Sequence, residues 1–128
     1  MSKYKNKKMI FNGITFQSTK ECKRYTQLLE KQRNGEISAL QTQVKYVLIP
    51  SQHEIYERYG KKGQKLKDGK RLLERECAYI ADFTYIDNST GETVVEDVKG
   101  YKRKGAYDLF TVKRKLMLYM HGIKIKEV

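Results

Sequence analysis

The stretch that most constrains this chain is residues 78–100, AYIADFTYIDNSTGETVVEDVKG, because it reads as two β-strands joined by a turn. Its two runs, 78–86 and 92–98, are rich in β-branched and aromatic residues, which favour strands. The segment between them, DNSTGE, holds Asp, Asn, Ser and Gly, which favour turns. A hairpin of this kind predicts that a β-sheet lies at the centre of the fold.

The hairpin carries acidic residues where a sheet normally presents apolar ones. If its loop has an even length, Ile86 pairs with Thr93, and the same register places Asp82 directly opposite Asp97. Directly opposed side chains share one face of the sheet, with Cβ atoms about 4.5–5.5 Å apart. A loop of odd length would instead place Asp82 on the face of Glu96. The sequence favours the even register, which brings two carboxylates together.

Two opposed carboxylates repel each other, so something must offset their charge. Because side chains alternate along a strand, Lys99 shares the face of Asp97, whereas Glu96 points to the other face. One interpretation is a structural ion pair with Lys99; the other is a site for Mg²⁺, which often takes only one or two protein carboxylates. Asp82 and Asp97 would then bind the ion, helped by the backbone carbonyl of Val98. Lys99 would assist hydrolysis of a phosphodiester bond.

The preceding part of the chain predicts a hairpin, a helix and a strand. Residues 9–16 contain Asn-Gly, the preferred two-residue hairpin turn. A capping box from Ser18 to Glu21 and a later Asn-Gly predict a helix from about 19 to 33. An alternating run that ends at the only proline predicts a strand over 37–50.

The end of the chain predicts a second helix over 105–122 and a closing strand over 123–128. We expect the helix to bury one stripe of apolar residues, made of Leu109, Val112, Leu116 and Met120. The order hairpin, α, β, β, β, α, β predicts an α/β domain in which helices flank one small mixed sheet.

Composition indicates a single domain with a polyanionic partner. The 128 residues include 27 basic and 15 acidic ones, which gives a net charge of +12. Residues 1–8 form a basic tail, and residues from about 55 to 70 are expected to form a mobile basic loop. No apolar run is long enough to cross a membrane, and no apolar segment follows the basic N-terminus, so we expect neither a membrane partner nor secretion. Cys22 and Cys77 are expected to be reduced thiols.

The acidic hairpin also carries a family resemblance. With Asp82, then Asp97-Val98-Lys99 on the next strand, after a helix that carries Glu21, the chain resembles the PD-(D/E)XK nuclease superfamily. The runs NGITFQSTKECKRYTQLLEKQRNGEISALQTQVKYVL, YIADFTY, VVEDVKG and VKRKL resemble small phage and prophage proteins of that superfamily, which are often compared with Holliday-junction resolvases. The resemblance covers most of the chain outside the basic loop. It departs at Ala81, where the superfamily name places a proline that binds no metal.

The resemblance implies a restriction-endonuclease-like core, αβββαβ, and a Mg²⁺ cofactor for which Mn²⁺ should substitute. It implies that Asp82 and Asp97 bind the metal and that Lys99 assists hydrolysis. It further implies that Glu21 joins the metal site from the first helix, although its place in the capping box gives it a competing role. Gln43 matches a polar site position on the first core strand, and an ordinary exposed strand residue is the other interpretation.

DNA is the substrate that the resemblance implies, so clustered basic residues are candidate phosphate contacts. These residues are Lys61, Lys62, Lys65, Lys67, Lys70 and Arg71 in the basic loop, Lys102, Arg103 and Lys104 after the hairpin, and Lys113, Arg114 and Lys115 on the last helix. A solvated surface without phosphate contacts is the alternative for each cluster. Tyr101 and Tyr107 are candidates for stacking on unpaired bases, although packing within the protein suits them better.

We therefore expect a Mg²⁺-dependent DNA endonuclease in the cytoplasm of a bacterial host. Branched DNA is a candidate substrate, and a symmetric homodimer is a candidate assembly because a resolvase must cut two strands in a matched way. Two alternatives are a non-catalytic DNA-binding module and a phage structural or interaction protein with the same fold. The intact set of Asp82, Asp97 and Lys99 argues against a pure binder, because opposed acids that face a phosphate would weaken binding.

Overall fold

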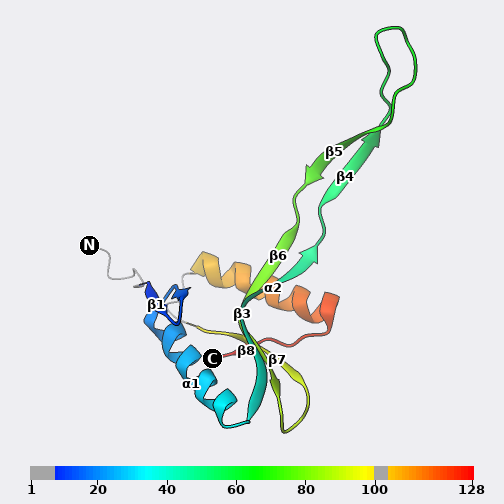
Figure 1. The fold of residues 1–128 in the computed structure, drawn as a ribbon. Helices are drawn as coiled ribbons and strands as arrows, with labels where there is room; N and C mark the ends of the chain where they lie inside the picture. Colours follow the sequence, from blue (N-terminus) through cyan, green and yellow to red (C-terminus); the bar gives the residue numbers. More distant parts are fainter. Residues whose placement is uncertain (1–7, 100–103) are drawn as a thin grey trace.

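The computed structural model of the protein describes residues 8–99 and 104–128, with side chains from residue 108 onward in the second range. Its central sheet has four strands, in the order β3-β6-β7-β8 (Figure 1). Their bounds are β3 (Ile37–Ile49), β6 (Cys77–Asp87), β7 (Thr93–Asp97) and β8 (Lys126–Glu127). The first three strands pair antiparallel and β8 runs parallel to β7. The predicted mixed sheet is confirmed, although β8 is shorter than the expected strand.

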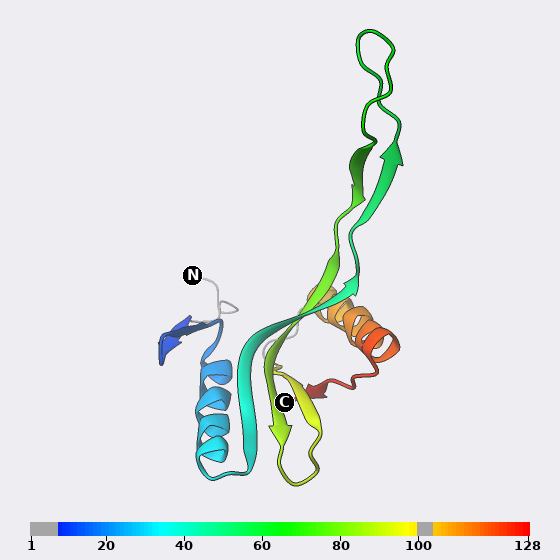
Figure 2. The same ribbon diagram turned by 45° about the vertical axis from the view of Figure 1, so that its right-hand side comes forward.

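Two helices flank the sheet, α1 (Thr19–Arg33) on one side and α2 (Lys104–His121) on the other (Figure 2). The Ser18 hydroxyl accepts a hydrogen bond from the Glu21 amide at 3.1 Å, so Ser18 is the N-cap of α1 as predicted. Asn34 caps the other end, and Gly35 follows with φ of +78°, which glycine adopts without strain. Neither described helix is long and apolar enough to cross a membrane.

A short hairpin precedes α1, as expected. Its strands are β1 (Met9–Phe11) and β2 (Ile14–Phe16), which pair antiparallel. The turn residues Asn12 and Gly13 have φ of 54° and 78°, which is the conformation that an Asn-Gly turn favours. The hairpin delivers Phe16, which is fully buried, to the interface between α1 and the sheet.

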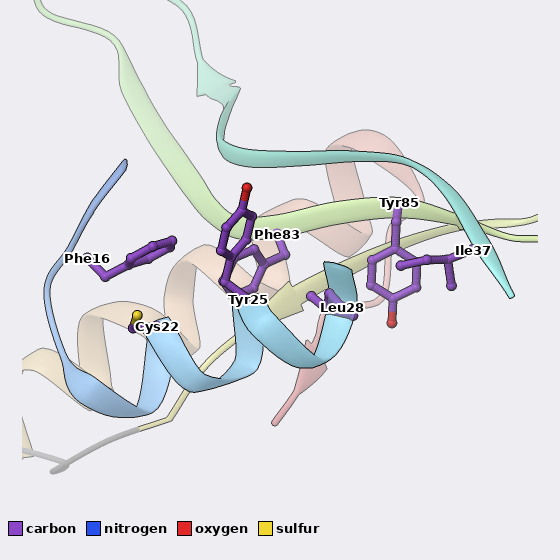
Figure 3. Close-up of a cluster of buried hydrophobic side chains, with 7 residues drawn as sticks. All are labelled: Phe16, Cys22, Tyr25, Leu28, Ile37, Phe83 and Tyr85. Carbon is purple, nitrogen blue, oxygen red and sulfur yellow. The ribbon is translucent and has the colours of Figure 1, made fainter. Parts of the chain in front are cut away.

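Helix α1 packs on the sheet through a cluster rich in aromatic side chains (Figure 3). Its members are Phe16, Cys22, Tyr25, Leu28, Ile37, Phe83 and Tyr85. The rings of Tyr25 and Phe83 stack with centroids 6.1 Å apart, and the Leu28 side chain is fully buried. Burial of one such side chain stabilises the fold by about 1.5–3 kcal/mol. This cluster fixes the position of the residues on the first turn of α1, including Glu21.

Helix α2 packs on the sheet through a second cluster, made of Leu48, Tyr79, Ala81, Val95, Met117 and Ile125. The predicted apolar stripe is wrong, because Leu109, Val112 and Met120 are 56%, 54% and 49% exposed and Leu116 is only partly buried. The helix has apolar residues at neighbouring positions, such as 109 with 110 and 116 with 117. It therefore has more than one apolar stripe, and the sequence does not tell which one meets the sheet.

Beyond the sheet, strands β3 and β6 lead into a long projecting hairpin, which we term the arm (residues 52–74) (Figure 1). It contains β4 (Gln52–Tyr56) and β5 (Gly69–Glu74), paired antiparallel. The expected mobile loop over about 55–70 is therefore wrong in part, since both of its ends belong to strands. Neither hydrophobic cluster of the described residues includes a residue of the arm, which explains why its sequence lacks apolar alternation. Instead, the Arg71 guanidinium bonds Glu54 at 2.8 Å and lies 4.6 Å from the centre of the Tyr56 ring.

The two clusters meet along β6 at Asp82. Tyr79 and Ala81 belong to the α2 cluster, whereas Phe83 and Tyr85 belong to the α1 cluster. These residues alternate along the strand and would share one face of a flat strand. The twisted strand therefore presents that face to α2 before Asp82 and to α1 after it. Asp82 lies at the change, between two packed cores.

Candidate active site

The register of the acidic hairpin is the even one. Ile86 pairs with Thr93, and the ladder continues to Phe83 and Glu96, so that prediction is confirmed. At the next position the Asp82 carboxylate accepts a hydrogen bond from the Val98 amide at 2.7 Å. The Asp82 side chain thereby accepts a hydrogen bond that a backbone carbonyl of β6 would accept in a continuous ladder. This bond keeps the end of β7 next to Asp82.

Asp97 is bound by two neighbours. Its carboxylate accepts a hydrogen bond from the Tyr79 hydroxyl at 2.8 Å and forms an ion pair with the Lys99 ammonium at 2.5 Å. The Asp97 and Lys99 side chains are only 14% and 17% exposed. Burial, with a contribution from Asp97, raises the pKa of Tyr79, so its hydroxyl stays protonated and keeps donating. Lys99 thus lies on the face of Asp97, as alternation predicts.

Glu21 enters the same cluster from α1, where it is 5% exposed. It accepts a hydrogen bond from the Gln43 amide group at 3.0 Å, and it is also hydrogen-bonded to the Asp82 carboxyl and to the backbone amide of Gln17. Glu21 thus bonds the amide of Gln17 rather than the Ser18 amide that a capping box predicts, and it lies beside Asp82. Its role as a metal ligand stays a prediction.

Gln43 reaches Glu21 from an unusual backbone conformation. It lies on β3 with φ of 54°, a region that residues other than glycine rarely adopt. Such a residue costs of order 1–3 kcal/mol and is found most often at functional sites. In this conformation the Gln43 side chain reaches the buried Glu21, and the hydrogen bond between them fixes the direction of the Glu21 carboxylate.

The acids of the cluster perturb one another. Burial, above all, raises the pKa of Asp82 to about 7; the Val98 amide opposes that rise. The carboxylates of Glu21 and Asp97 also favour the protonated form of Asp82. Burial likewise raises the pKa of Glu21. Lys99 forms its ion pair with Asp97, and burial favours the protonated forms of Asp82 and Glu21.

The residues of the cluster suit a divalent cation in kind and charge. Among the described residues no group of three or more Asp, Glu, His or Cys side chains has a ready-made metal arrangement. The contacts explain this, because Asp97 turns to Tyr79 and Lys99 while Asp82 bonds Glu21. Mg²⁺ often takes only one or two carboxylates, and the hard carboxylate oxygens of Asp82 and Asp97 fit that ion.

The opposite face of β7 holds a separate buried ion pair. Glu96 is fully buried and accepts hydrogen bonds from Arg24 at 2.8 and 2.6 Å and from the Tyr85 hydroxyl. Burial opposes ionisation of Glu96, but these hydrogen bonds outweigh it and lower the pKa of this carboxyl. The ion pair links α1 to β7 directly behind the acid cluster.

The candidate phosphate contacts lie in several places. Those of the arm are exposed, although Lys65 lies 3.7 Å from Glu57 and Arg71 pairs with Glu54. On α2, Arg114 pairs with Glu127 at 3.5 Å, Lys113 is half-buried and Lys115 is exposed. Tyr101, Lys102 and Arg103, together with the side chains of Lys104 and Tyr107, lie outside the described residues.

Sequence reasoning missed several neighbours of the cluster. Tyr79 bonds Asp97, Arg24 supports β7 from behind, and the Lys20 ammonium bonds the carbonyl of Lys99. A usable signal existed for Arg24, which follows Glu21 by three positions and so lies on the helix face toward the sheet. No comparable pattern marks Tyr79, because its contact depends on the twist of β6.

One family model, described as a protein of unknown function (DUF1064), matches residues 1–126. The chain belongs to this family. Comparison with curated proteins and with solved structures gives no match. The family description states no activity, so a function must be argued from the geometry of the acid cluster.

Proposed function

We propose that this DUF1064 chain is a Mg²⁺-dependent deoxyribonuclease with a restriction-endonuclease-like core. The observation that carries the proposal is the convergence of Glu21, Asp82 and Asp97 beside Lys99. The ion pair of Lys99 with Asp97 offsets the charge of one of these three carboxylates, so it does not account for all of them. A site that binds a cation and then a phosphate would account for them.

Asp82 and Asp97 would hold the ion, with the carbonyl of Val98 beside them. The bound ion supplies polarisation of the phosphate and a lower pKa for a nearby water molecule. The Lys99 ammonium stabilises the negative charge that grows on the phosphate oxygens in the transition state. The Tyr79 hydroxyl fixes the orientation of Asp97, and Gln43 does the same for Glu21.

DNA as the substrate is supported by charge. The net charge of the chain is +12, and the arm presents exposed lysines at a distance from the acid cluster (Figure 1). Phosphate contacts of this kind supply most of the sequence-independent affinity for DNA. The arm would then hold the duplex while the cluster cuts, whether the substrate is linear or branched.

The test is a cleavage assay on linear, nicked and four-way DNA with Mg²⁺, with Mn²⁺ and with EDTA. We expect cleavage with either metal and none with EDTA. Asp97→Asn should lower the rate by at least about 10²-fold, the low end for loss of one preorganised catalytic group. The matched control is Asp87→Asn at the far end of β6, which should cut like the wild type. Equal rates for Asp97→Asn and wild type would refute the proposal.

A non-catalytic DNA-binding module is the second candidate. One observation favours it: in the described part of the chain, no buried side-chain nitrogen or oxygen lacks a hydrogen-bond partner, so the acids are satisfied without a metal. This candidate predicts salt-dependent DNA binding and no cleavage of any DNA form with either metal. A structural or interaction protein would show neither property.

A further inference from the structure

A pocket opens between β6 and α2 at the base of the arm. Its volume is about 320 Å³, and its lining is mostly apolar. The lining residues are Ala78, Tyr79, Ile80, Leu109, Phe110 and Lys113. None of these residues is an acid of the cluster, so the pocket is distinct from the candidate metal site.

The pocket shares a wall with the candidate active site. Tyr79 lines the pocket, and its hydroxyl bonds Asp97. Phe110 also lines the pocket, and the Lys99 ammonium lies over its ring. The two rings pack with centroids 6.3 Å apart and planes at 58°. A phosphate beside Lys99 and Asp97 would therefore have this pocket next to it.

The character of the pocket indicates its ligand. Ile80 and Leu109 are 53% and 56% exposed at its rim, so a flat apolar group placed there would remove apolar surface from water. Lys113 in the lining places a positive charge beside this apolar surface. A nucleobase joined to a phosphate combines the apolar face with the negative charge, and bases stack on aromatic and apolar side chains in this way.

We infer that this pocket receives the base of a nucleotide next to the scissile phosphate. The inference rests on the proposed nuclease function and names its substrate class. In a duplex the bases are stacked and paired, so a base enters such a pocket only after it has left the stack. The preferred substrate is therefore DNA with unpaired nucleotides beside the cut, as at a branch point, a flap or a mismatch, rather than continuous duplex.

The test uses Leu109→Ser, with Val112→Ser as the matched control. Both residues are exposed to a similar extent on α2, but only Leu109 lines the pocket. Each protein is titrated in EDTA, which prevents cleavage, against duplex and flap oligonucleotides that carry 2-aminopurine at the branch. With wild type and Val112→Ser, we expect a change in 2-aminopurine emission on the flap and at least about fivefold tighter binding to flap than to duplex. Leu109→Ser should lose both while it still binds duplex.

Several outcomes decide the matter. If Leu109→Ser distinguishes flap from duplex as well as the control does, the pocket assignment is overturned. If Leu109→Ser instead converts a dimer to a monomer in sedimentation, the pocket is an interface between copies, and the assignment is again overturned. If the wild type shows the 2-aminopurine change but cuts no DNA with Mg²⁺ or Mn²⁺, the pocket stands and the nuclease function fails.

Discussion

The two ends of β6 lead to regions of opposite character. Toward residue 83 the strand runs between two packed helices, and the acids Glu21, Asp82 and Asp97 are held by hydrogen bonds from Gln43, Val98 and Tyr79. In the other direction the chain leaves the cores and enters the arm, where every strand residue except Gly69 is exposed. The same antiparallel pairing thus continues from a buried region into the arm. We term the buried region, made of the β3-β6-β7-β8 sheet with α1 and α2, the body. The arm is held by backbone hydrogen bonds and by ion pairs between surface side chains.

This difference separates two physical tasks. Groups that act on a phosphate must be held in fixed positions at low dielectric, which requires packing on both sides. Groups that attract a polyanion need only exposed charge, since counterion release does not depend on burial. Substitutions in the body should therefore change chemistry and stability, whereas substitutions in the arm should change binding alone.

The largest expected effect is on the body, from Lys99→Met. The change removes the ammonium that stabilises charge on the phosphate and keeps the length of the side chain. We expect the cleavage rate to fall by about 10²- to 10³-fold. Because Lys99 is not a metal ligand in our proposal, Mn²⁺ should still bind, as titration calorimetry would show. Lys45→Met, at an exposed ion pair with Glu76, is the control and should cut normally.

A rate for Lys99→Met within a factor of three of wild type would remove Lys99 from the chemistry. The distinction between body and arm would then have lost its strongest support, because a half-buried lysine would matter no more than an exposed one.

The next effect concerns stability of the body. Glu96→Gln keeps the shape of the side chain but leaves Arg24 without a buried anion. We expect the free energy of unfolding to fall by roughly 2–3 kcal/mol, as for hydrogen bonds to charged groups. Denaturant titration measures this loss. Glu54→Gln makes the corresponding change at the Arg71 pair of the arm, where both partners are exposed, and should cost about 0–1 kcal/mol. Equal losses in the two variants would contradict the distinction between body and arm.

How well the sequence predicted each region follows from the same difference. The body was predictable where local chemistry decides the structure, as with the Asn12-Gly13 turn, the cap at Ser18 and the even register that pairs Ile86 with Thr93. The face of α2 that meets the sheet was not predictable, because adjacent residues such as Leu109 and Phe110 are both apolar.

The arm was missed because the signal used to find strands is absent there. Apolar alternation marks a strand that covers a core, and β4 and β5 contribute to neither hydrophobic cluster of the described residues. Glycine at position 69 does have a structural reason, because a Cβ there would lie 2.3 Å from the Tyr56 ring. The candidate site falls between these cases: the acids Asp82 and Asp97 were visible in the register, but the contact of Tyr79 with Asp97 needed the twist of β6.

A smaller effect is the pH dependence of the metal-free protein. Burial raises the pKa of Asp82 to about 7 in the folded state, above an unfolded value of about 3.9. Between these values the folded protein holds a proton that the unfolded chain has lost, so stability is present at low pH and is lost as pH rises through about 7. The melting temperature in EDTA should be several degrees higher at about pH 5.5 than at about pH 8.

Asp82→Asn removes the titrating group and should flatten that profile, while saturating Mg²⁺ should reverse it, because metal binds the ionised carboxylates. Glu96 does not produce this trend. Its pKa is lowered in the folded state, so its ionised form stabilises the fold at pH values above the usual pKa of Glu, and this stabilisation is lost only as the pH falls below that value. The interpretation of Asp82 as the protonated acid fails if the wild-type profile is flat in EDTA or if Asp82→Asn leaves its slope unchanged.

The smallest effect on the fold, and the clearest on binding, is expected in the arm. Four of its lysines are exposed and have no acidic partner among the described residues: Lys61, Lys62, Lys67 and Lys70. Replacing all four with Gln should lower the slope of log affinity for duplex DNA against log salt by up to about 0.9 for each phosphate that the arm no longer neutralises. Each substitution should change stability by less than about 0.5 kcal/mol, because these side chains support no buried group.

The matched control also lies on the arm. Lys65 and Arg71 already face Glu57 and Glu54, so part of their charge is offset before DNA arrives. Replacing this pair with Gln should lower the slope by less per residue than replacing the unpaired lysines. If the two sets change the slope equally per residue, local pairing is irrelevant and only total charge matters. If neither set changes the slope, the arm does not touch phosphate, and DNA binding must arise on the body, where Lys113 and Lys115 are the next residues to replace.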